Sequence, residues 1–123
     1  MNTGKRPSTE EIFGMMKQTM GSVPAAIEKA AKVDGSVLEE HMRSRAYAMP
    51  KDGALDDETR TLIYLAAALA AGSKACIQAM SNKARMQGIP KEKIMETFRI
   101  TRFALATKVI GDAEAVFESL THA

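Results

Sequence analysis

A chain of 123 residues with a formal net charge of +2 is long enough for one domain with a small core. We therefore expect residues 1–123 to form a single helical domain. The basic residues form no dense stripe with interleaved aromatic side chains, so we expect no nucleic-acid partner. One cysteine excludes an intramolecular disulfide, and the longest apolar run, residues 62–71, is too short to span a bilayer. With no signal peptide visible, we expect a cytoplasmic protein without a membrane partner.

Helix-capping residues recur along the chain and predict an all-α fold with short connections. Ser8 and Glu11 have the spacing of a capping box, and Ser36 with Glu39 repeat that spacing. Asp56 caps a later helix. No alternating strand pattern occurs. We predict six to seven helices, over residues 9–20, 24–33, 37–48, 57–71, 74–87, 90–111 and 113–120.

Three apolar patterns indicate how these helices pack. The alanine-rich stretch 66–71 predicts a central helix that neighbours approach closely. In the sixth helix, the spacing of Ile94, Phe98, Leu105 and Val109 predicts a buried stripe. The first three helices carry many methionines and other apolar residues. Those residues complete the core, line an interface between copies of the chain, or do both.

The single cysteine, Cys76, is the most reactive side-chain type in the chain. If Ser73 is the N-cap of the fifth helix, Cys76 is its third residue, where the positive end of the helix dipole favours a thiolate. The alternative is that Cys76 is a small buried apolar residue. Met80 follows one turn later on the same helix face, and we expect it to pack in the core. We expect no metal and no cofactor.

Residues 55–117 resemble the carboxymuconolactone decarboxylase and alkylhydroperoxidase D-like family. The resemblance rests on residues 55–63, the alanine-rich helix, the segment around Cys76, and residues 87–94, where Lys93 replaces an acidic residue of the family pattern. It implies an oligomeric all-α bundle of six to seven helices. It also implies a homo-oligomer, either a trimer or a hexamer.

Redox members of this family carry Cys-x-x-Cys-x-x-x-His and a glutamate that joins the same proton relay. The corresponding residues here are Thr61, Ser73, Cys76 and Met80, so the motif is degenerate. A dithiol cycle needs a second sulfur. The resemblance therefore implies that a peroxidase cycle would use Cys76 alone and an external thiol reductant.

Three functions remain open at this point. The first is an antioxidant peroxidase or thiol oxidoreductase with Cys76, Glu58 and His41 as catalytic residues, and with Thr61, Tyr64, Ser73 and Met80 lining the pocket. The second is a non-catalytic oligomeric protein that binds a small molecule on the same scaffold. The third is a lactone decarboxylase in which Glu58 or His41 takes the acid–base role.

Overall fold

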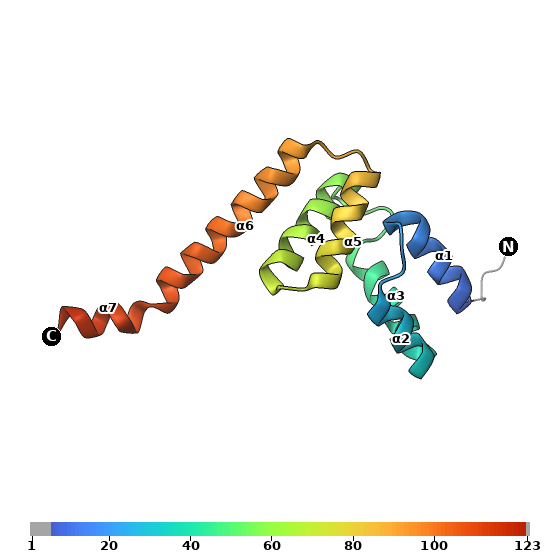
Figure 1. Ribbon diagram of the computed structural model, residues 1–123, viewed down its shortest axis with the longest axis horizontal. Coiled ribbons are helices and arrows are strands. Elements are labelled where there is room, and N and C mark those ends of the chain that lie inside the picture. Colours follow the sequence, from blue (N-terminus) through green and yellow to red (C-terminus); the bar gives the residue numbers. More distant parts are fainter. Residues whose placement is uncertain (1–5, 123) are drawn as a thin grey trace.

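The computed structural model describes residues 6–122, which fold into seven helices and contain no strand (Figure 1). The predicted all-α fold is confirmed. The helices are α1 (Thr9–Met20), α2 (Ala25–Val33), α3 (Gly35–Ala48), α4 (Asp57–Ala71), α5 (Lys74–Met86), α6 (Lys91–Asp112) and α7 (Glu114–Thr121).

Local hydrogen bonds fix most of the helix starts where they were predicted. The hydroxyl of Ser8 accepts from the N–H of Glu11 at 3.1 Å, and the Ser8 N–H donates to the Glu11 carboxylate at 3.3 Å. Asp56 accepts from the N–H of Thr59 at 2.8 Å and caps α4. These contacts satisfy N–H groups that have no partner inside a helix.

The start of α3 differs from its prediction. The capping box expected at Ser36 and Glu39 is wrong, because Asp34 is the N-cap and the helix already begins at Gly35. The Asp34 carboxylate accepts from both the N–H and the hydroxyl of Ser36, at 3.0 and 2.8 Å. These bonds lower the pKa of Asp34 below its usual value. A carboxylate two residues earlier thus takes the capping role that the spacing of Ser36 and Glu39 suggested.

The centre of the molecule is the antiparallel pair α4 and α5. Gly72, with a φ of 72°, ends α4 in the left-handed region that favours glycine, and Ser73 then caps α5. α6 and α1 pack on this pair, on α4 and α5 respectively, and α2 packs on α3. Ala68 of α4 and Ala84 of α5 are buried, in agreement with the close approach expected of small side chains.

The first three helices hold a second apolar cluster. Ile12 and Met16 of α1 and Leu38 of α3 are its buried centre. The half-buried apolar residues around them are Phe13, Met20, Val23, Ile27, Ala31 and Met42. The N-terminal apolar residues therefore do contribute to the core.

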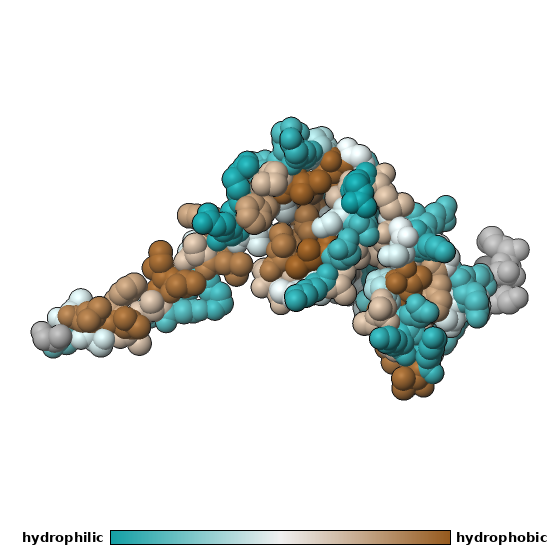
Figure 2. Space-filling model, in the orientation of Figure 1, coloured by the Kyte–Doolittle hydropathy of each residue, from teal (hydrophilic) through white to brown (hydrophobic). Residues whose placement is uncertain are grey.

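The C-terminal half of α6 extends away from the other helices, and α7 continues beyond it (Figure 1). The buried stripe predicted for α6 is wrong beyond Ile94, which is half-buried: Phe98, Leu105 and Val109 are 44%, 39% and 66% exposed. Thr101 is the buried residue of this helix. The prediction fails because no other described helix covers this half of α6. Figure 2 shows apolar residues along the projecting segment. Among the described residues, no helix is both long and apolar enough to cross a membrane.

Candidate thiol site

Cys76 lies in the first turn of α5 and is half-buried. Its backbone N–H donates to the Ser73 hydroxyl at 3.4 Å, which confirms Ser73 as the N-cap and Cys76 as the third helical residue. The sulfur lies 3.7 Å from the hydroxyl of Tyr64 on α4, and either atom could donate the hydrogen bond. The pairing of α4 with α5 thus places a phenol beside the thiol.

Tyr64 is held in its protonated form. Burial raises the pKa of its phenol, and the hydrogen bond with Cys76 raises this pKa further. A tyrosine that keeps its proton is a hydrogen-bond donor for a negatively charged sulfur. The phenol is therefore placed to donate a hydrogen bond to the Cys76 sulfur.

Thr61, also on α4, is buried and has Gln87 as its hydrogen-bond partner. Its side chain is 1% exposed, and its hydroxyl donates to the side-chain oxygen of Gln87 at 2.7 Å. Because Gln87 follows the last residue of α5, this hydrogen bond joins α4 to the far end of α5 from Cys76. Gln87 was not a candidate in the sequence, and no local pattern could have paired residues 61 and 87.

We expect Thr61→Val to lower the stability of the fold without changing its shape. Valine nearly matches threonine in volume, so the change removes one buried hydrogen bond, worth about 1 kcal/mol. Thermal denaturation followed by circular dichroism should show a melting temperature about 3–6 °C lower. Thr19→Val is the matched control, because the exposed Thr19 hydroxyl bonds only to its own helix backbone. Equal melting temperatures for the two variants would contradict this structural role for Thr61.

Glu58 points its carboxylate at a cation. Its oxygen lies 2.6 Å from the Lys93 ammonium, and this contact joins α4 to α6. The hydrogen bond and the charge of Glu58 raise the pKa of Lys93. Lys93 is the residue that replaces an acidic residue of the family pattern, and here it is the partner of Glu58.

A separate cleft of about 400 Å³ lies between α1, α3 and the α4–α5 pair. His41, Tyr64 and Met80 line it, so the structure brings these three candidates together. Cys76, Ser73, Thr61 and Glu58 are not among its lining residues. Tyr64 lies between the cleft and the thiol site, because it lines the cleft while its hydroxyl contacts Cys76.

Two cationic residues of the cleft were missed in the sequence. Arg45 from α3 and Lys83 from α5 both line it. Burial lowers the pKa of Lys83, and the charge of Arg45 lowers it further. Residues 45 and 83 are far apart in the chain, so only the approach of α3 to α5 reveals them as neighbours.

Within residues 6–122, no group of three or more His, Cys, Asp or Glu side chains is arranged to hold a metal ion. The helical scaffold and the Cys76–Tyr64 pair together describe an all-helical protein with a candidate thiol site.

The sequence profile of the carboxymuconolactone decarboxylase family matches residues 37–119, and the chain belongs to this family. The matched region begins within α3 and ends within α7, so α1 and α2 lie outside it. No curated protein matches the chain.

Proposed function

We propose that the protein reduces hydroperoxides through Cys76 in a single-cysteine cycle, at the expense of an external thiol. The observation that carries this proposal is the 3.7 Å contact between the Cys76 sulfur and the Tyr64 hydroxyl in the first turn of α5. In this proposal the thiol is the attacking group, and the phenol supplies the proton that a leaving oxygen needs.

The cycle balances with two equivalents of external thiol. The Cys76 thiolate attacks the distal oxygen of a hydroperoxide, the O–O bond breaks, and the leaving alkoxide takes a proton from Tyr64. The resulting sulfenic acid condenses with one external thiol and releases water. A second external thiol gives its proton to the Tyr64 phenolate and attacks the mixed disulfide, which restores the Cys76 thiolate and releases the oxidised reductant. The net reaction converts the hydroperoxide and two thiols into an alcohol, water and a disulfide.

We also propose that the active form is a homo-oligomer. The apolar residues of α6 and α7 that no described helix covers support this, since such a surface is costly in water. A trimer or a hexamer is the assembly that the family resemblance implies.

Ligand binding without turnover is the second candidate function. Two observations favour it: the cleft is large enough for a small molecule, and Thr61 and Met80, which stand at relay positions of redox relatives, are buried in the core. Lactone decarboxylation has less support, because Glu58 is paired with Lys93 and His41 is an exposed side chain at the cleft.

We expect Tyr64→Phe to slow hydroperoxide consumption by at least about 10-fold, because the leaving oxygen loses its positioned proton donor. The assay follows loss of tert-butyl hydroperoxide with dithiothreitol as the reductant. Tyr47→Phe is the matched control, since Tyr47 on α3 is 82% exposed, and it should leave the rate unchanged. Equal rates for wild type and Tyr64→Phe would remove Tyr64 from the proposed mechanism.

A further inference from the structure

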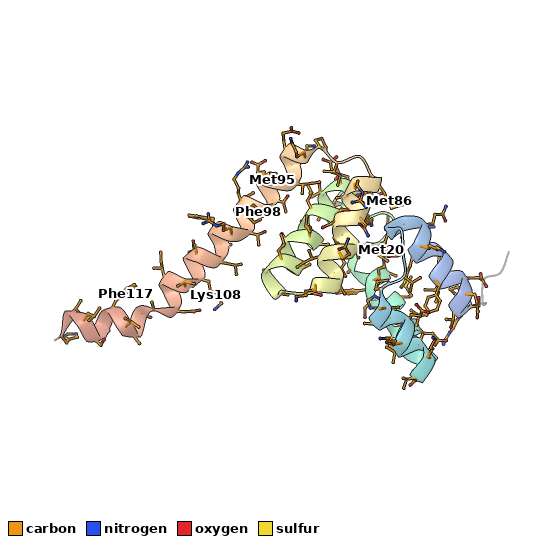
Figure 3. The ribbon with its side chains drawn as sticks, viewed as in Figure 1. Met20, Met86, Met95, Phe98, Lys108 and Phe117 are labelled. Carbon is orange, nitrogen blue, oxygen red and sulfur yellow. The ribbon has the colours of Figure 1, made fainter. Side chains whose placement is uncertain are left out.

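The cleft between α1, α3 and the α4–α5 pair has walls rich in sulfur. Methionine is unbranched and polarizable, so such walls adapt to the shape of a flexible apolar guest. Figure 3 shows one of them, Met20, at the end of α1 near α5. The lining methionines are Met15, Met16, Met20, Met42, Met49 and Met80.

The charges that line the cleft are of one sign. Arg45 and Lys83 line it, His41 stands beside them, and no aspartate or glutamate is among the lining residues. Within residues 6–122, neither Arg45 nor Lys83 forms an ion pair; the paired arginine of α3 is Arg43, which contacts Glu40. The negative charge of Asp57 on α4 acts to raise the pKa of Lys83, but Asp57 does not line the cleft and forms no ion pair with Lys83 in the described part of the chain. Two cations from different helices that face one cavity with no acidic residue in its wall leave a place for an anion.

Part of the cleft wall lies outside the region that matches the family profile. Met15, Met16 and Met20 come from α1, which lies outside the region that matches the family profile. Cys76 does not line the cleft. The cleft is therefore separate from the thiol site and is built in part from a segment that family membership does not account for.

We propose that this cleft binds an amphiphilic carboxylate, with its hydrocarbon chain against the methionines and its carboxylate on Arg45 and Lys83. A volume of about 400 Å³ is in the range of small-molecule sites. The proposal goes beyond the redox function and does not require turnover at Cys76; it gives a ligand class to the second candidate function.

The test uses decanoate as the probe, with binding to the full chain measured by isothermal titration calorimetry. We expect decanoate to bind, and decanol and decylamine, which have the same chain without the negative charge, to bind at least about 10-fold more weakly. Acetate, which has the charge without the chain, should show no measurable binding. If decanol binds as tightly as decanoate, or if decanoate does not bind, the proposal is wrong.

Variants separate the charged end from the apolar wall. Arg45→Met and Lys83→Met should each weaken decanoate binding about 10- to 100-fold, while Arg45→Lys and Lys83→Arg keep most of it. Ala48→Phe, at a lining residue near the end of α3, should block binding by filling the cleft without changing a charge. Each variant is checked by circular dichroism for its helix content, and unchanged decanoate affinity in a folded Arg45→Met, Lys83→Met double variant overturns the proposal.

Cys76→Ser separates this proposal from the redox function. Because Cys76 does not line the cleft, decanoate affinity should stay within about twofold of wild type when hydroperoxide consumption is lost. Loss of decanoate binding in a folded Cys76→Ser variant would contradict a separate site. Decanoate binding by a wild-type protein that consumes no hydroperoxide would contradict the redox function alone.

Discussion

We expect the double substitution Phe103→Glu and Val109→Glu to convert the protein from an oligomer into a monomer. The two side chains lie on the projecting half of α6 and are 74% and 66% exposed. Burying one large apolar side chain is worth about 1.5–3 kcal/mol, so losing two weakens self-association by about 3–6 kcal/mol. That is a loss of roughly 10²- to 10⁴-fold in affinity.

The shape of the molecule explains why this effect is large. α6 and α7 project from the body with apolar residues along them, among them Phe98 and Phe117 (Figure 3). A helix without tertiary packing is only marginally stable in water, so a second copy that covers this segment would also stabilise its helical form. The other exposed large apolar residues of α6 and α7 are Met95, Ile100, Leu105, Ile110, Val116 and Leu120.

Mass in solution is the measurement, by light scattering on a sizing column at several protein concentrations. Lys91→Glu is the control: it changes charge on the same helix, but at the end attached to the body, and should leave the mass unchanged. A wild-type chain that is monomeric at every concentration would contradict the proposed assembly. A double variant that keeps the wild-type mass would place the interface elsewhere.

Cys76→Ser should reduce hydroperoxide consumption to the rate of the buffer with reductant. A serine hydroxyl does not ionise near neutral pH, so it cannot replace a thiolate as the attacking group. Serine is close in size to cysteine, so circular dichroism should show the same helix content. Retained consumption by Cys76→Ser would exclude the single-cysteine cycle.

Ser73→Cys tests the same site by adding a second thiol. Ser73 and Cys76 are the N-cap and third residue of α5, already in contact through the Ser73 hydroxyl and the Cys76 N–H. We expect one equivalent of hydroperoxide to oxidise this variant to an intramolecular disulfide, because a resolving sulfur then lies beside the sulfenic acid. Mass spectrometry and thiol counting measure the product.

Ala75→Cys is the control, because it adds a thiol at a different position in the same helix turn. Residue 75 adjoins Cys76 in the helix, where successive side chains point in different directions. The variant has the same number of thiols but should form no internal disulfide. Equal disulfide yields in the two variants would show that proximity at the helix start does not direct the reaction.

Short-range features made the helices predictable. The capping bonds of Ser8, Asp56 and Ser73 and the left-handed turn at Gly72 involve residues at most a few positions apart. The sequence alone therefore placed the helices nearly where they are found. The exception is the third helix, for which Ser36 was predicted as the N-cap and Asp34 is the N-cap in the structure.

The candidate site was predictable only in part. The place of Cys76 in the first turn of α5 follows from Ser73 as the N-cap. The partners of Thr61 and Glu58 were not predictable, since Gln87 and Lys93 reach them from the end of α5 and from α6. Such contacts depend on where distant helices meet.

By itself, the sequence determined the all-helical fold, most of the helix ends and the family, because capping residues and the family motif involve residues that are close together in the chain. The tertiary structure alone decided that Arg45 and Lys83 share a cleft and that the apolar residues of α6 stay uncovered. Helical periodicity tells which residues share a face, but only the packing of the helices determines whether that face is covered.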